Sequence, residues 1–327
     1  MASKGRWWLA CASLVSAQSW TPQQSGTAAD LRGVSAVSSK VVWAGGTKGT
    51  FLESTDSGST WRAASVPGAA DLDFRGVQGI DAKTAFLLSS GPGEKSRIYK
   101  TVDAGANWRA LQINPDPKGF WDAIAMWDPL HGIVLGDPIN GRFTIYTTSD
   151  GVTWQPQKGP PANSNEGAFA ASNSCLIVHG AHEAWFGTGG QSGARVFHSE
   201  DGGKTWSAAK TPIRHDSENA GIFSLAFSDS LHGIAVGGDY KDAQTARDTL
   251  ALTDDGGKTW RAASAPFGYR SAAAYIPSAR KWVVTGPDGS DWSADRLTWT
   301  QFSGGYNAIS LPWAVGPAGA IGLIDIP

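Results

Sequence analysis

The amino-acid sequence predicts an all-β fold, a seven-bladed β-propeller in which similar four-stranded sheets stand in a ring. An eight-residue motif, Ser/Thr-x-Asp-x-Gly-x-Thr-Trp, recurs along the chain. Its tryptophans lie about 40–54 residues apart, a period that suits one blade of four short strands. Seven segments also resemble the start of an inner strand, and the two chain ends each contain only part of a repeat.

The bulk composition agrees with a large folded β domain. Of the 327 residues, 41% are hydrophobic and 17% are charged, which allows a substantial core and argues against disorder. Glycine occurs 41 times and tryptophan 16 times, as expected for many tight turns and for large rings packed between sheets. The formal net charge is -2 and basic residues form no run, so we expect no nucleic-acid partner.

The N-terminus has the pattern of an export signal. Lys4 and Arg6 precede an apolar stretch over residues 7–15, and small residues follow it. This stretch is shorter than the roughly 20 residues that cross a bilayer, so we expect no transmembrane segment. The sequence therefore predicts a signal peptide over residues 1–17 and a single propeller domain over 18–327, in a secreted or periplasmic protein. Cys175 would then be the last cysteine, expected to be buried and without a disulfide.

The recurring motif is the Asp-box, a structural turn. Four copies are complete, at residues 54–61, 101–108, 199–206 and 253–260; those at 148–154 and 293–299 are shorter, and the last lacks the glycine. We expect the aspartate and the Ser/Thr hydroxyl to accept hydrogen bonds from backbone N–H groups of the hairpin, and the tryptophan to be buried in the blade. The aspartates are Asp56, Asp103, Asp150, Asp201, Asp255 and Asp295, and the tryptophans are Trp61, Trp108, Trp154, Trp206, Trp260 and Trp299.

Neither a metal nor a cofactor is predicted. Asp254 and Asp255 form an acidic pair like that of a calcium loop, but the further oxygen ligands and the closing glutamate of such a loop are missing. His179 and His182 have the spacing of metal ligands, yet only Glu183 stands beside them.

The ends of the chain complete the ring. Seven inner strands are indicated, but only six Asp-boxes. The chain ends after the strand-like residues 320–324, where a seventh box is due, whereas residues 19–22 resemble the Trp-led strand that follows each box. An N-terminal strand in the last blade would close the ring and remove its free edge. We therefore favour seven blades, with six as the second choice. The inner strands begin near Leu31, Phe74, Trp121, Asn165, Phe223, Tyr269 and Tyr306.

The first residues of the inner strands should surround the mouth of the central channel. In ring order these positions are Arg270, Asn307, Arg32, Arg75, Asp122, Glu166 and Phe223. The hypothesis is a charged funnel whose arginine side binds an anionic segment or ligand. In the alternative, the arginines and carboxylates only pair with one another around a wet channel. The longest insertion, over residues 238–248, is the best candidate for a loop that contacts a partner.

The segments at 31–35, 74–77, 131–136 and 232–237 make the chain resemble the photosystem II stability/assembly factor-like propellers. More distantly, its boxes resemble those of sialidases and sortilins. The closer resemblance implies an exported, non-enzymatic scaffold for membrane-protein assembly, located in the thylakoid lumen if the organism is photosynthetic. It also implies an arginine patch, to which we match Arg32, Arg75 and Arg270. The expected partner is a protein, such as a membrane-protein complex or its exposed segment, and the chain is expected to be a monomer.

A glycoside hydrolase of the sialidase type is the alternative function. Asp122 and Glu166 on adjacent blades would supply the acid and the base or nucleophile. This requires the two carboxylates about 5–10 Å apart in an open pocket. No segment like Phe-Arg-Ile-Pro is present, so we favour a binding scaffold and leave open whether the chain is an enzyme.

Overall fold

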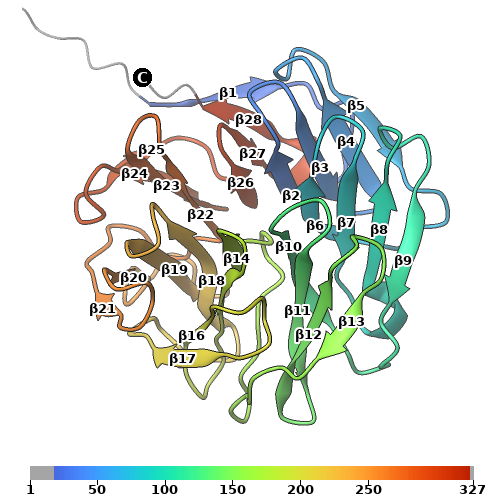
Figure 1. Ribbon diagram of the computed structural model, residues 1–327. Helices are drawn as coiled ribbons and strands as arrows, with labels where there is room; N and C mark the ends of the chain where they lie inside the picture. Colours follow the sequence, from blue (N-terminus) through green and yellow to red (C-terminus); the bar gives the residue numbers. More distant parts are fainter. Residues whose placement is uncertain (1–17, 325–327) are drawn as a thin grey trace, which may run out of the picture.

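The computed structural model describes residues 18–324, and the predicted signal peptide over 1–17 lies outside this range. Within 18–324 the chain forms 28 strands in seven four-stranded antiparallel sheets, which stand as blades around a central channel (Figure 1). The helices of this range are two short 3₁₀ turns, η1 (Gly93–Lys95) and η2 (Pro317–Gly319). No helix in these residues is long and apolar enough to span a bilayer. The predicted seven-bladed propeller is confirmed.

Each blade is a meander that runs from an inner strand at the channel to an outer strand at the rim (Figure 1). Blade 1 contains β2 (Leu31–Ala36), β3 (Val42–Gly46), β4 (Thr50–Ser54) and β5 (Arg62–Ser65). Blade 2 contains β6 (Phe74–Gly79), β7 (Ala85–Ser89), β8 (Arg97–Thr101) and β9 (Arg109–Ile113). Blade 3 contains β10 (Trp121–Met126), β11 (Gly132–Ile139), β12 (Arg142–Thr148) and β13 (Gln155–Gln157).

The second half of the ring follows the same order. Blade 4 contains β14 (Leu176–His179), β15 (Glu183–Gly187), β16 (Arg195–Ser199) and β17 (Ser207–Lys210). Blade 5 contains β18 (Ala220–Phe227), β19 (Gly233–Asp239), β20 (Leu250–Thr253) and β21 (Arg261–Ala262). Blade 6 contains β22 (Ala272–Ile276), β23 (Lys281–Gly286), β24 (Gly289–Ser293) and β25 (Thr300–Phe302).

Blade 7 joins the two ends of the described chain. It contains β26 (Ala308–Ser310), β27 (Trp313–Val315), β28 (Ile321–Ile324) and, as its outer strand, β1 (Trp20–Gln23). Trp20 lies opposite Ile324 in the antiparallel register, its ring packs on Tyr306 at 5.1 Å, and its Nε1 donates to the Ser290 hydroxyl at 2.9 Å. The predicted closure by an N-terminal strand is confirmed, and it leaves blade 7 with four strands like its neighbours.

The Asp-boxes have the predicted turn geometry. In the first box, Asp56 Oδ1 accepts from the Thr60 N–H at 2.9 Å, and the Ser54 hydroxyl accepts from the Gly58 N–H at 2.9 Å. In the box that lacks glycine, Arg296 takes the left-handed conformation with φ of 68°, and its N–H donates to the Ser293 hydroxyl. The hydrogen bonds of that box lower the pKa of Asp295 to about 2. The shortened boxes therefore preserve the same side-chain bonds to the backbone.

The core lies between neighbouring blades, and the box tryptophans belong to it. Trp61 of blade 1 packs edge-on against Trp313 of blade 7, with ring centroids 5.5 Å apart. Trp299 of blade 6 packs in the same way against Phe267, which follows blade 5, at 5.3 Å. Each tryptophan thus joins its own blade to the preceding one. Cys175 is fully buried and free, as expected, and burial raises the pKa of its thiol.

The inner strand of blade 4 differs from the prediction. Residue 167 does pair with the second strand, through hydrogen bonds between Gly167 and Gly189, but the ladder resumes only where Leu176 faces Phe186. The predicted strand at residues 165–168 is therefore wrong, since β14 begins at Leu176. Residues 168–174, which we call the channel loop, leave the sheet between these two points.

Candidate functional site

The channel loop is held by side-chain hydrogen bonds to other blades. Asn173 bonds both backbone groups of Ile124 in blade 3, accepting from its N–H at 2.8 Å and donating to its carbonyl at 2.9 Å. Ser172 donates to the Ser271 carbonyl beside blade 6 at 2.7 Å, and the Ser174 hydroxyl lies 2.7 Å from that of Ser224 in blade 5. The loop thus spans the channel, and residues of blades 3, 5 and 6 hydrogen-bond with it.

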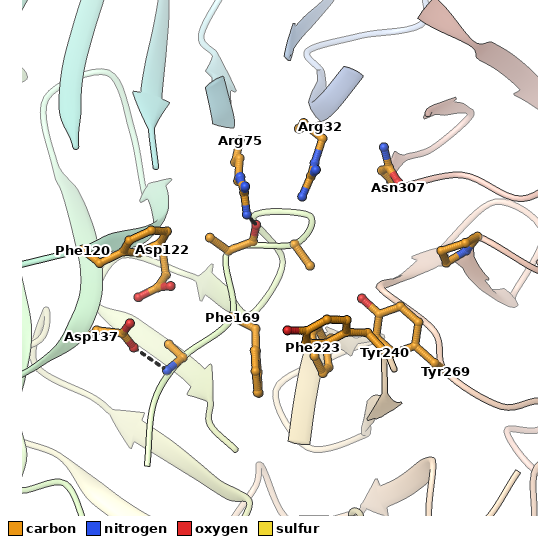
Figure 2. Close-up of a pocket in the computed structure, with 14 residues that line it drawn as sticks. Arg32, Arg75, Phe120, Asp122, Asp137, Phe169, Phe223, Tyr240, Tyr269 and Asn307 are labelled. Atoms are coloured by element: carbon orange, nitrogen blue, oxygen red, sulfur yellow. Dashed lines mark hydrogen bonds between the residues drawn. The ribbon is translucent and has the colours of Figure 1, made fainter. Parts of the chain in front are cut away.

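A pocket of about 510 Å³ lies at the channel mouth, with the channel loop as part of its lining. Figure 2 shows three kinds of side chain around it: arginines with Asn307, a pair of aspartates, and a group of aromatic rings. The lining residues are Arg32, Arg75, Phe120, Asp122, Asp137, Ala168, Phe169, Ala170, Ala171, Phe223, Tyr240, Tyr269, Pro287 and Asn307.

The basic side of the pocket consists of Arg32 and Arg75. Arg75 is occupied, because its Nε donates to Asp73 at 2.8 Å and its Nη1 to the Ala170 carbonyl of the channel loop at 2.9 Å. Arg32 has no hydrogen bond or ion pair among residues 18–324, and its buried Nε is without an acceptor. Burial, and then the charge of Arg75, hold the pKa of Arg32 below its ordinary value. Arg32 is therefore a cation without a counterion.

The acidic side consists of Asp122 and Asp137. Asp122 is 1% exposed, and its Oδ2 atom is buried without a hydrogen-bond donor. Asp137 Oδ1 accepts from the Ala168 N–H of the channel loop at 3.0 Å. Burial, and then the Asp137 carboxylate, raise the pKa of Asp122 well above its ordinary value; burial raises the pKa of Asp137 to about 6. The two carboxyl groups are thus close enough to resist a second negative charge.

The aromatic side is a cluster built from three parts of the chain. Phe169 of the channel loop stacks on Phe223 of β18 with ring centroids 4.0 Å apart. Tyr269, which precedes blade 6, meets the edge of Phe223 at 4.7 Å. Tyr240 comes from the insertion over 238–248, and its ring centroid lies 6.2 Å from that of Phe223. We call these four residues the aromatic wall; it offers apolar surface beside the charged groups (Figure 2).

Five of the seven residues predicted at the channel mouth line this pocket. They are Arg32, Arg75, Asp122, Phe223 and Asn307. Arg75 and Asp122 do not form the direct ion pair considered as the alternative, because Arg75 pairs with Asp73.

Arg270 and Glu166 do not line the pocket, which corrects their predicted place at the mouth. Arg270 is 3% exposed, and its guanidinium bonds Asp291 of β24 at 2.7 and 3.0 Å within its own blade. Glu166 bonds the Arg195 Nε at 2.8 Å and the Thr188 hydroxyl at 2.7 Å. In both cases a buried charge is neutralised by a partner on the third strand of the same blade, which inner-strand order alone does not reveal.

This arrangement also bears on the hydrolase alternative. The hydrolase alternative requires Asp122 and Glu166 together in an open pocket. Glu166 is buried, however, and its carboxylate also accepts from the Asn163 N–H. The carboxylate beside Asp122 is Asp137 instead. The predicted acid–base pair is therefore not assembled.

Two features of the lining were not predicted, namely the proximity of Asp137 to Asp122 and the channel loop with Phe169. Asp137 stands at the end of β11, where the register shifts between Gly136 and Pro138. The proline after Asp137 signals such an irregularity, because proline cannot continue a ladder. Phe169 and its loop were not predicted, although the run Ser172-Asn173-Ser174 is typical of loops and could have indicated a departure from a strand. Tyr240 lies in the insertion that was expected to face a partner.

Comparison with known proteins supports the sequence resemblance. A family model described as BNR/Asp-box repeat matches residues 197–208, the box of blade 4. Photosystem II assembly protein Ycf48 of Synechococcus sp. (strain JA-2-3B'a(2-13)) is 25% identical, with 60% of this chain and 78% of that protein covered. The chloroplastic photosystem II stability/assembly factor HCF136 of Arabidopsis thaliana is 28% identical, with 34% of this chain and 26% of that protein covered.

A solved structure shares the fold of the whole described ring. The structure titled "YCF48 bound to D1 peptide" superposes with a TM-score of 0.66 at 17% identity, and the match covers 94% of this chain and 97% of that chain. The predicted resemblance to photosystem II assembly factor-like Asp-box propellers is confirmed.

Proposed function

We propose that this propeller is a non-catalytic scaffold that holds an exposed segment of a protein partner in the pocket at its channel mouth. The observation that carries the proposal is Arg32, a partly buried guanidinium without a counterion, set beside Arg75 and across from the aromatic wall. An anionic group would form charge-assisted hydrogen bonds with Arg32 without first breaking an ion pair.

The size and shape of the pocket favour a short segment as the ligand. A volume of about 510 Å³ accommodates a few side chains, not a folded domain. The channel loop spans the channel behind the pocket and bonds to the surrounding blades, so a segment would enter from the mouth. Aromatic rings supply rigid apolar contact area at low entropic cost.

The relatives suggest the kind of partner. Ycf48 and HCF136 are named as photosystem II assembly or stability factors, and the related YCF48 structure contains a D1 peptide. By analogy, the partner of this chain would be a segment of a membrane-protein complex. Export through the N-terminal signal would place a monomeric scaffold in the periplasm or outside the cell, or in the thylakoid lumen of a photosynthetic host.

A pull-down from native membranes tests the proposal. The bait proteins are the wild type, the Arg32→Glu/Arg75→Glu variant and, as a matched control, Arg109→Glu on the exposed outer strand of blade 2. We expect the double variant to lose at least about tenfold in recovery of the captured proteins, because two repulsive charges replace two attractive ones. Equal recovery by all three baits would overturn the proposal, provided that circular dichroism shows each to be folded.

A further inference from the structure

The acidic side of the pocket has no assigned role in binding an anionic segment. Asp122 lines the pocket, is 1% exposed and leaves its Oδ2 atom without a donor among residues 18–324. A buried carboxylate oxygen without a hydrogen bond costs free energy, so folding alone does not favour it. In Figure 2 its carboxylate points toward Asp137, on the side of the pocket away from Asn307.

Among residues 18–324, no cationic side chain forms an ion pair or a hydrogen bond with these two carboxylates. The guanidinium of Arg75 influences Asp122 by its charge, but its hydrogen bonds go to Asp73 and the Ala170 carbonyl. Asp137 receives the Ala168 N–H and takes part in none of the ion pairs formed by residues 18–324. The pair therefore presents negative charge to whatever enters the pocket.

The charges follow one another in a fixed order around the pocket. The Asp137 carboxylate raises the pKa of Asp122, and the Arg75 guanidinium lowers it. The same guanidinium lowers the pKa of Arg32. The carboxylates of Asp73 and Asp30 raise the pKa of Arg32, although neither forms an ion pair with it. A negative half and a positive half thus adjoin, with apolar rings beside them (Figure 2).

We propose that the pocket is a dipolar site: its ligand places a cationic group against Asp122 and Asp137, an anionic group against Arg32, and an apolar body on the aromatic wall. This inference rests on the proposed function and narrows its ligand. A cation at this end of the pocket would offset the negative charge of the aspartate pair. Two sources share this chemistry, namely a free aromatic amino acid and a protein segment with a basic and an acidic residue on either side of an apolar one.

Small probes of one shape test the two charges separately. The probes are phenylalanine, 3-phenylpropionate without the ammonium, and 2-phenylethylamine without the carboxylate, titrated at pH 8 with ligand-observed NMR. The peptide arm uses acetyl-Lys-Phe-Glu-amide and acetyl-Gln-Phe-Glu-amide. We expect the dipolar member of at least one arm to bind about tenfold more tightly than its singly charged analogues, as charge-assisted hydrogen bonds suggest. The arm that binds identifies the source.

The Asp122→Asn/Asp137→Asn variant keeps both side-chain shapes and removes the negative charge that the pair carries. It should abolish the advantage of the dipolar probe and leave the anion-only probe unchanged, whereas Asp71→Asn, at an exposed carboxylate outside the pocket lining, should change neither. Equal binding of dipolar and singly charged probes, or no binding of any, would overturn the inference. If Asp122→Asn/Asp137→Asn captures partners as the wild type does while Arg32→Glu/Arg75→Glu does not, the proposed function stands and the cation subsite alone fails.

Discussion

At the scale of single residues, the pocket depends on charges that the fold leaves unpaired. Most buried charges of this protein have a partner, as Arg270 has Asp291 and Glu166 has Arg195. Arg32 and Asp122 are different, because the guanidinium has no acceptor for Nε and the carboxylate no donor for Oδ2. Such groups reduce stability when the site is empty. Their presence in one pocket is the strongest indication of a ligand.

The aspartate pair predicts a pH dependence of stability. The pKa of Asp137 is raised to about 6, so the folded state binds more protons than the unfolded state between about pH 4 and 6. The contribution of this carboxyl to stability therefore falls as pH rises through that window. We expect Asp137→Asn, which can still accept from the Ala168 N–H, to be more stable than the wild type at pH 7.5, by no more than about 3 kcal/mol.

Urea unfolding at pH 4.5 and 7.5 checks this expectation. The difference between Asp137→Asn and the wild type should be small at pH 4.5 and larger at pH 7.5. Asp71→Asn, which removes an exposed carboxylate, should follow the wild type at both values. A constant difference between Asp137→Asn and the wild type would show that Asp137 keeps its charge throughout. Because Asp122 and Asp137 interact, the midpoint observed would belong to the pair.

At the scale of elements, the channel loop is the feature that converts a propeller channel into a lined pocket. It starts at the end of the Gly167–Gly189 bridge and ends where β14 begins. Its backbone supplies the Ala168 N–H to Asp137 and the Ala170 carbonyl to Arg75, and its Phe169 side chain belongs to the aromatic wall. The loop therefore touches all three sides of the pocket.

Asn173 should be the residue that secures this loop. Replacing it by alanine removes two buried hydrogen bonds and leaves both backbone groups of Ile124 unsatisfied, which we expect to cost about 2–4 kcal/mol of the free energy of unfolding. Asn173 has a φ of 69°, so part of any loss reflects backbone strain in alanine. Asn140→Ala is the matched control, since Asn140 is exposed and has a φ of 51°. Equal losses in the two variants, measured by urea unfolding, would assign the whole effect to the backbone.

At the scale of the whole molecule, the ring is held closed by one short strand. β1 adds four residues to the edge of blade 7, although it is far in sequence from the other strands of that blade. Trp20 packs against Tyr306 and Phe302. Without β1, the edge of β28 would be unpaired, and an open sheet edge invites association with other chains. Closure thus bears on both stability and solubility.

Trp20→Ala tests how far the ring depends on this strand. The ring of Trp20 is buried and donates to Ser290, so its loss should cost about 3–5 kcal/mol and lower the thermal midpoint. Thr21→Ala, at an exposed position of the same strand, should change little. A single unfolding transition with an unchanged midpoint in Trp20→Ala would mean that closure contributes nothing measurable.

The sequence by itself determined the architecture, because Asp-box turns with their tryptophans are local features that recur in every blade but the last; the tryptophan rings are buried in blades 3 and 6 and half-buried in the others. Ring closure was also predicted, because the strand missing after the last repeat is the kind of strand that the N-terminal residues resemble. Six of the seven inner strands lie near their predicted positions, and five of the seven predicted channel-mouth residues line the pocket.

Only the tertiary structure decided which charges face the pocket. Arg270 and Glu166 were predicted at inner-strand positions like those of Arg32 and Asp122, yet each bonds a partner on the third strand of its blade, Asp291 or Arg195. The path of residues 168–174 was equally hidden, because its hydrogen bonds go to other blades. A repeat pattern specifies the strands and turns within each blade. The side chains that face the channel depend on contacts between residues far apart in sequence.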